Sequence, residues 1–182
     1  LKAHGRKPKA LFTSDPDAVY AREYTFDLSK IRPVVAKPDF VDNLVPAEEV
    51  RGVKIDEAFL GSCNNGRIED LRVGASILKG RHVAEKVRFL VVPASQTVYL
   101  QALKEGLIDT FIEGGAIVMN PNCSVCWGSC QGVIGENEVL ISTGTRNFKG
   151  RAGHPSSKVY LGSAATVTAS AIKGEIALAS DL

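Results

Sequence analysis

The sequence lacks any apolar run that approaches the ~20 residues of a membrane-spanning helix. It also lacks an excess of charge of either sign. The 22 lysines and arginines stand against 20 aspartates and glutamates, which leaves a formal net charge of +2. So small a balance gives no electrostatic basis for binding nucleic acid or an anionic membrane. We therefore expect neither a nucleic acid nor a membrane as a partner.

Cysteine is sparse, with four residues in 182, which is too few for the disulfide framework of a small secreted protein. The first residues, LKAHGRKPKALF, contain no apolar segment like that of a secretory signal peptide. We therefore expect a reducing, cytoplasmic location, where closely spaced cysteines favour metal or redox chemistry. The chain begins with Leu1 instead of methionine, which suggests processing or a piece of a longer polypeptide.

The positions of the prolines and the spacing of the apolar residues predict that the chain has two parts. Five of the eight prolines fall in the first 50 residues, where they oppose long helices, so residues 1–50 are predicted to form an irregular lead-in packed on a core. In residues 51–182 buried strands alternate with helices, which is typical of a mostly parallel sheet in a three-layer α/β/α domain. Strands are predicted at 55–63, 86–95, 116–123, 138–145 and 159–163, and helices at 68–80, 96–115 (interrupted at Gly106) and 163–174.

Chemically active residues lie at, or just past, the carboxyl ends of four predicted strands: Cys63, Ser95, Cys123 and Arg146. In open α/β sheets, ligands bind in the crevice outside the carboxyl ends of the strands. Four such residues at four strand ends therefore predict one site, assembled from loops at a single edge of the sheet.

The cysteines allow several interpretations. Cys123 and Cys126 form a C-x-x-C pair, a spacing that both zinc and iron–sulfur clusters accept, and Cys63 at another strand end strengthens a metal site. With Cys130 as a fourth ligand, the site would be a closed zinc site or an electron-transfer cluster. With three thiolates, one iron of a 4Fe–4S cluster would stay free to bind substrate. The remaining alternative is a metal-free chain whose thiols are ordinary buried residues.

Two arginines, Arg146 and Arg151, flank Gly150 in the loop after the predicted strand 138–145. Guanidinium groups bind carboxylates through paired hydrogen bonds. Their position at the cysteine edge of the sheet suggests a small dicarboxylic or tricarboxylic acid as the ligand.

Four segments, GSCNNGRIEDLR, NPNCSVCWG, STGTRNFKGR and VYLGSAATVTASAIKGEI, occur in an order and spacing that resemble the aconitase superfamily. They look closest to the cluster-binding third domain of the isopropylmalate isomerase and homoaconitase large subunits. SDPDAVY and VVPASQTVYLQALKEGLI extend the resemblance over nearly the whole chain. The resemblance implies a 4Fe–4S cluster on Cys63, Cys123 and Cys126, whose free iron acts as a Lewis acid. It implies dehydration and rehydration of a hydroxy acid, with Arg146 and Arg151 binding substrate.

The resemblance also implies roles for the remaining candidate residues, the location of the catalytic base and the substrate. Cys130 matches no family ligand and is predicted to be a small buried residue. Asn65, Ser95 and Thr145 are candidates for side chains that surround and support the metal ligands. Thr145 stands where the family commonly has asparagine. In the family, a swivelling domain or a separate small subunit supplies the catalytic base, so this chain alone is expected to be inactive. The implied substrate is 3-isopropylmalate, with homoaconitate or a methylated malate as alternatives.

Overall fold

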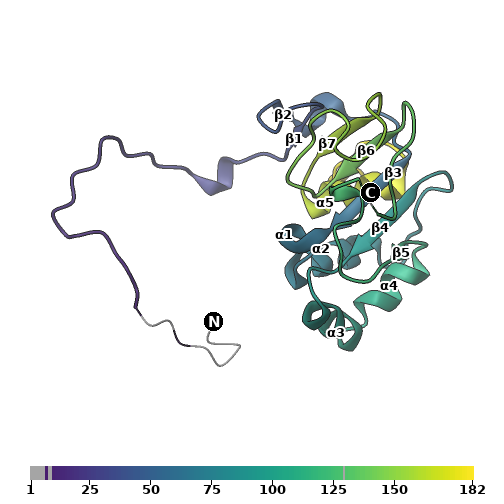
Figure 1. Cartoon of the computed structure of the whole chain (residues 1–182), viewed down its shortest axis with the longest axis horizontal. Helices are drawn as coiled ribbons and strands as arrows, with labels where there is room; N and C mark the ends of the chain where they lie inside the picture. Colours follow the sequence, from purple (N-terminus) through teal and green to yellow (C-terminus); the bar gives the residue numbers. More distant parts are fainter. Residues whose placement is uncertain (1–6, 8–9, 129) are drawn as a thin grey trace. The chain divides into compact units, whose positions relative to one another are not determined.

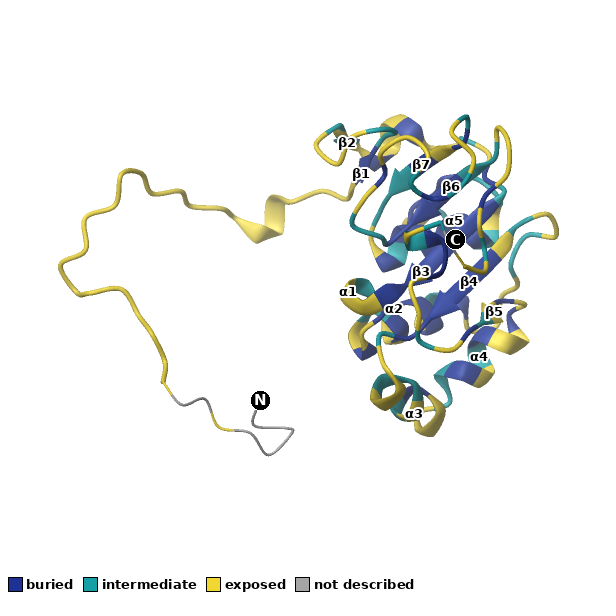
Figure 2. Ribbon diagram, in the orientation of Figure 1, coloured by how far each residue is buried: buried dark blue, intermediate teal, exposed yellow. Residues whose placement is uncertain are grey.

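The computed structural model describes residue 7, residues 10–128 and residues 130–182. The chain divides into two compact units, Leu1–Ile31 and Arg32–Leu182. In the first unit, every described residue is exposed (Figure 2). Its described part contains the 3-10 helix η2 (Leu28–Lys30), which begins where the Asp27 carboxylate accepts a hydrogen bond from the Ser29 N–H at 3.0 Å.

The second unit is built on a seven-stranded sheet with the strand order β2-β1-β7-β6-β3-β4-β5 (Figure 1). The central strand β3 pairs in parallel with β4 on one side and with β6 on the other. β5 and β7 extend the parallel part, whereas β1 joins β7 in antiparallel orientation and forms a hairpin with β2. The strands are β1 (Val34–Ala36), β2 (Leu44–Pro46), β3 (Glu57–Gly61), β4 (Arg88–Val92), β5 (Ile117–Val118), β6 (Val139–Ser142) and β7 (Lys158–Leu161).

The helices follow the expected signals. The Ser163 hydroxyl accepts a hydrogen bond from the Thr166 N–H at 3.2 Å at the start of the last α-helix, which ends at Gly174 as predicted. Within the described residues, no helix is both long and apolar enough to cross a membrane. The helices are α1 (Ser62–Asn65), α2 (Ile68–Leu78), α3 (Gln96–Lys104), α4 (Leu107–Glu113) and α5 (Ala164–Lys173), with the 3-10 helices η3 (Ala47–Val50), η4 (Ser124–Cys126) and η5 (Ala179–Asp181).

The predicted α/β class with a mostly parallel sheet is confirmed, and each predicted strand and helix has a counterpart. One strand is much shorter than its prediction: β5 covers two residues of the predicted segment 116–123. The Met119 N–H still donates to the Val91 carbonyl at 2.9 Å, after which the chain bends at Pro121 and Asn122. Proline removes the donor that a continuing strand needs.

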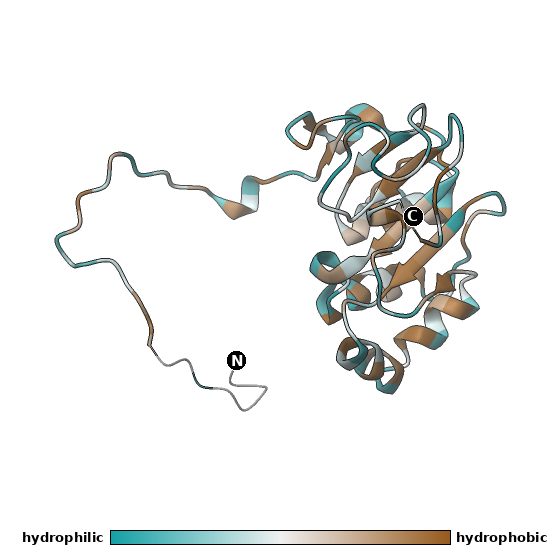
Figure 3. Ribbon diagram, in the orientation of Figure 1, coloured by the Kyte–Doolittle hydropathy of each residue, from teal (hydrophilic) through white to brown (hydrophobic). Residues whose placement is uncertain are grey.

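The two faces of the sheet are covered differently. Alternate residues of β3 point to opposite faces: Leu60 packs in the cluster that contains the buried sides of α2 to α5, whereas Phe59 packs in a second cluster. That second cluster is closed by Val125 of η4, Ile134 and Ala152, which lie in connecting segments. The layer on this face is therefore made of loops and η4. The central strands between the layers are strongly apolar (Figure 3).

The β1–β2 hairpin is attached to the loop that follows β6. The buried Asn147 donates from Nδ2 to the carbonyls of Lys37 at 2.8 Å and Phe40 at 3.3 Å. The hairpin therefore belongs structurally to the Arg32–Leu182 unit, and its loop fixes the chain next to Arg146. The division into a lead-in, residues 1–50, and a cluster-binding domain, residues 51–182, stays a prediction.

A buried carboxyl group lies at the opposite end of β3. Glu57 is 0% exposed, and its Oε2 accepts a hydrogen bond from Arg88 Nε at 2.9 Å. Its Oε1 has no hydrogen-bond partner among the described residues. Arg88 also donates to both carboxylate oxygens of Glu138, at 3.0 and 2.7 Å. Burial raises the pKa of Glu57 to about 7, because removing the carboxylate from water outweighs the attraction of Arg88.

This raised pKa predicts a stability that falls as the pH rises. Between pH 4.5, the ordinary pKa, and about pH 7, the folded chain keeps a proton on Glu57 that the unfolded chain releases. Glu57→Gln should remove about 2–3 kcal/mol of this pH dependence. Urea denaturation at about pH 5 and about pH 8 measures it, with Glu113→Gln, at an exposed position, as the control. An unchanged pH dependence in Glu57→Gln would contradict this account.

Candidate functional site

The carboxyl ends of the central strands lie side by side. The parallel register pairs Gly61 with Val92 and Phe59 with Ser142, so β3, β4 and β6 end at the same edge. β3 leads directly into α1, which carries Cys63, and β6 leads into the loop that carries the two arginines. The topology therefore brings these two predicted parts of the site to one edge of the sheet.

The Cys63 segment is held by close backbone contacts. A Cβ atom on Gly61 would lie 2.5 Å from the Val92 carbonyl oxygen, so only glycine lets β3 pass β4 this closely. Ser62 follows with a φ of 72°, a left-handed backbone conformation that is sterically unfavourable for residues other than glycine. The Ala94 N–H donates to the Gly66 carbonyl at 2.8 Å and closes the segment against β4. Cys63 is thus an exposed residue on a tightly constrained turn.

The C-x-x-C segment forms a compact turn next to the same edge. Asn122 Oδ1 accepts a hydrogen bond from the Ser124 N–H at 2.6 Å, and the Cys126 N–H donates to the Cys123 carbonyl at 3.0 Å. Val125 is fully buried and anchors the turn in the second apolar cluster. Its burial leaves Cys123 exposed and Cys126 partly exposed. The Cys126 Sγ lies 3.7 Å from the place a Cβ on Gly144 would occupy.

The arginine loop contacts the C-x-x-C turn directly. Arg151 Nε donates to the Cys126 carbonyl at 2.8 Å, and its guanidinium lies over the Phe148 ring, 5.4 Å from the centroid. Arg146 is exposed, and among the described residues it donates only locally, to the Thr145 carbonyl at 2.7 Å. Among the described residues, neither arginine forms an ion pair with a carboxylate. Both guanidinium groups keep N–H donors available for an anion.

Asn65 and Ser95, two of the three further candidates, have structural contacts of their own. Asn65 donates from Nδ2 to the Thr143 carbonyl, which connects α1 to the loop after β6. The Ser95 hydroxyl accepts a hydrogen bond from the Val98 N–H at 3.2 Å and caps α3. The role of Asn65, Ser95 and Thr145 as side chains that surround and support the metal ligands stays a prediction.

The burial predicted for Cys130 is wrong. Cys130 is exposed, and its thiol lies 3.7 Å from Asn122 Oδ1. The apolar cluster below the turn is filled by Val125, Ile134 and neighbouring residues, which leaves the later part of the loop at the surface. Asn122 is a residue that the sequence analysis missed. An asparagine before a tight turn is a local signal that could have revealed it.

The cysteines are the candidate donors for a metal. All four cysteines are free thiols. Among the described residues, no three His, Cys, Asp or Glu side chains come close enough to hold one metal ion. An iron–sulfur cluster makes a different demand, because each thiolate binds its own iron. The exposed and partly exposed thiols of α1 and the C-x-x-C turn, with Arg151 bonded to the Cys126 carbonyl, fit an anionic cluster in their chemistry.

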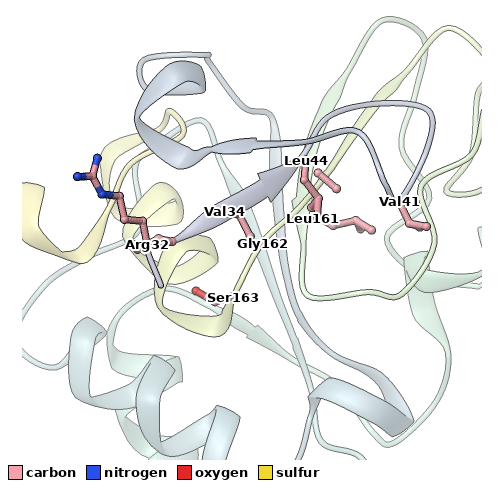
Figure 4. A pocket seen from close by; sticks show the side chains of 9 residues that line it. Arg32, Val34, Val41, Leu44, Leu161, Gly162 and Ser163 are labelled. Atoms are coloured by element: carbon pink, nitrogen blue, oxygen red, sulfur yellow. The ribbon is translucent and has the colours of Figure 1, made fainter. Parts of the chain in front are cut away.

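An apolar pocket of about 420 Å³ lies by the carboxyl end of β7, under the β1–β2 hairpin (Figure 4). Apolar side chains dominate its lining, among them Val34, Val41, Leu44 and Leu161. Within the described chain, its lining includes no cysteine and neither arginine of the site. The pocket is therefore separate from the cysteine and arginine loops.

Comparison with known proteins gives concordant results. The family described as "Aconitase family (aconitate hydratase)" matches residues 41–174. The probable methanogen homoaconitase large subunit of Methanothermobacter thermautotrophicus is 52% identical over 97% of this chain and 41% of its own length. The 3-isopropylmalate dehydratase large subunit 2 of Archaeoglobus fulgidus is 52% identical over 90% of this chain and 39% of its own. The chain thus spans about two fifths of the length of these relatives.

The C-x-x-C turn packs closely on the arginine loop at Gly128, so replacing this glycine should lower the free energy of unfolding strongly. Its φ is 66°, and a Cβ there would lie 2.6 Å from the Arg151 carbonyl oxygen. Gly80 has a similar φ of 72° with no atom within 4 Å of its Cβ position. Gly80→Ala should therefore cost only the backbone strain, about 1 kcal/mol, and Gly128→Ala about 2 kcal/mol more. Equal unfolding free energies in urea would refute the close contact.

Proposed function

Because this chain belongs to the aconitase family, we propose that it is the cluster-binding part of an iron–sulfur hydro-lyase. The substrate class is a small hydroxy di- or tricarboxylic acid. The observation that carries the proposal is the Arg151–Cys126 contact, which joins the C-x-x-C turn to an arginine with free donors. A Lewis-acidic metal site beside carboxylate-binding groups can remove water from a hydroxy acid, because the metal activates the hydroxyl group and the arginines hold the carboxylates.

We propose Cys63, Cys123 and Cys126 as the ligands of a 4Fe–4S cluster. When bound, such a cluster supplies a Lewis-acidic iron without a protein thiolate, which activates a hydroxyl group for departure as water. The chain's own contribution is orientation. The turn held by Asn122 and Val125 presents Cys123 and Cys126, and the constrained turn after Gly61 presents Cys63.

Arg146 and Arg151 are proposed to bind the substrate carboxylates. Arg151 is already oriented by the hydrogen bond from its Nε to the Cys126 carbonyl and by stacking on Phe148. These two contacts hold its terminal nitrogens in place. Such preorganisation reduces the entropy lost on binding. Arg146, which is exposed, supplies a second positive charge from the same loop.

The first candidate substrate is 3-isopropylmalate, because relatives that are about half identical carry the name 3-isopropylmalate dehydratase large subunit. Homoaconitate is the alternative, from a relative with that printed name, and a methylated malate is a third candidate. Thr145 provides a hydroxyl beside Arg146 where the resembled family commonly has an amide, so it is a candidate for selecting among these acids.

The active enzyme is proposed to need more than this chain. The relatives are named large subunits and are much longer than the matched region. We propose that the remainder of a large subunit and a separate small subunit complete the site and supply the catalytic base. The chain alone is then expected to be inactive. A reducing cytoplasm is the proposed location, because the ligand cysteines must not be oxidised to disulfides.

A function of another class, a four-thiolate metal or electron-transfer module, depends on Cys130. Only the three-ligand interpretation leaves an iron free for substrate. The exposed position of Cys130, eight residues after Asn122 and beside its side chain, keeps this alternative testable by a single substitution.

Anaerobic reconstitution with iron and sulfide separates the two functions. Wild type and Cys130→Ala should each bind about four irons per chain, with the broad visible absorption of a cluster. Replacing Cys63, Cys123 or Cys126 by serine should abolish this absorption. Loss of the cluster in Cys130→Ala would favour the four-thiolate module. Absence of iron from the wild type would refute both metal-binding functions.

The role of the arginines is tested in the completed complex of large and small subunits. Arg146→Gln should lower kcat/KM for the hydroxy acid by about 10- to 100-fold, because a charge-assisted hydrogen bond to carboxylate is lost. Lys149→Gln, in the same exposed loop, is the matched control and should change kcat/KM by less than about twofold. Equal effects of the two substitutions would argue for general charge attraction and against specific binding by Arg146.

A further inference from the structure

We propose that Thr143 is a positioning residue for Cys63, an inference that rests on the proposed cluster ligands. Thr143 follows the last residue of β6 and is only 3% exposed. It has no thiol or charge and lies far from Cys63 in the sequence. Its backbone and side chain nevertheless make several contacts with the segment that ends β3 and begins α1.

The hydroxyl of Thr143 takes the place of a backbone group in the sheet. The Thr143 N–H donates to the Phe59 carbonyl at 2.9 Å, as in a parallel ladder. If the ladder continued, the Gly61 N–H would donate to the Thr143 carbonyl. Instead it donates to Thr143 Oγ1 at 2.9 Å, and the same hydroxyl lies 3.4 Å from the Gly61 carbonyl oxygen, to which it donates.

Because the Gly61 N–H bonds to the Thr143 side chain and not to its backbone, the Thr143 carbonyl is left free for another donor. The freed carbonyl accepts a hydrogen bond from Asn65 Nδ2. Asn65 is the last residue of α1, the four-residue helix that contains Cys63. So short a helix has little stability of its own and depends on such anchors. Thr143 therefore holds both ends of the Cys63 segment, at Gly61 and at Asn65.

Removing the hydroxyl should disturb Cys63 by either of two routes. In Thr143→Val the buried Gly61 N–H either stays without a partner or returns to the Thr143 carbonyl, where it competes with Asn65. Both outcomes loosen α1 while the volume of the side chain is nearly unchanged. Thr143→Ser retains the hydroxyl and should behave as the wild type.

The chain offers a matched control for the loss of a buried hydroxyl. Thr168 in α5 is 0% exposed, and its Oγ1 has no hydrogen-bond partner among the described residues. Thr168→Val makes the same chemical change without breaking a bond. Val167→Ala, also at a fully buried position in α5, lowers stability without touching Thr143 and so controls for simple destabilisation.

Two measurements on the whole chain test the proposal. The first is the amide hydrogen exchange of residues 62–66 in the cluster-free chain, measured by mass spectrometry. The second is the rate at which a chelator removes iron from the reconstituted chain. Thr143→Val should accelerate both about tenfold, the expected effect of losing one buried hydrogen bond. Thr143→Ser, Thr168→Val and Val167→Ala should leave both within about threefold of the wild type.

Each result is decisive. Wild-type exchange of residues 62–66 in Thr143→Val would overturn the positioning role, even if the cluster binds normally and the proposed function stands. Faster exchange in a chain whose wild type binds no iron would support the anchor and refute the cluster. If Thr143→Val does not fold, Asn65→Ala replaces it, because it breaks the same anchor from the other side. Wild-type exchange and iron retention in Asn65→Ala would then overturn the proposal.

Discussion

The parallel register of β3 between β4 and β6 is the constraint on which the site depends. It aligns the three strand ends, so that the segments leaving them start from one edge. The close approach of Gly61 to the Val92 carbonyl keeps β3 tightly against β4 up to its last residue. Cys63 follows two residues later, and a shift of the register by one residue would move the side chains of β3 to the opposite faces of the sheet.

The uneven covering of the sheet explains how loops hold a site. Helices α2 to α5 bury one face, and the other face is buried by the connecting segments themselves. Val125 and Ala152 anchor the C-x-x-C turn and the arginine loop in the same apolar cluster. Segments that carry functional side chains therefore also carry core residues. Their geometry is fixed by burial, and this satisfies the need of a binding site for rigid support.

The order of strands and helices was predictable because segments such as FLVV are continuously apolar, but the strands end about two to five residues before the predicted limits. The helix limits at Ser163 and Gly174 followed from local capping signals. The exposure of Cys130 was not predictable, since a cysteine is as compatible with burial as with the surface and only packing decides. Thr143 could not be recognised either. Its role arises from contacts with Gly61 and Asn65, about eighty residues away, which no local pattern encodes.

We propose that three thiolates, one from α1 and two from the C-x-x-C turn, hold a cluster with one iron left for substrate. Mössbauer spectroscopy of the anaerobically reconstituted chain tests it most directly, because it distinguishes irons by their ligands. The account predicts two kinds of iron, a majority bound by thiolate and sulfide and a single site without a protein thiolate. Four equivalent thiolate-bound irons, or a single mononuclear iron, would contradict it.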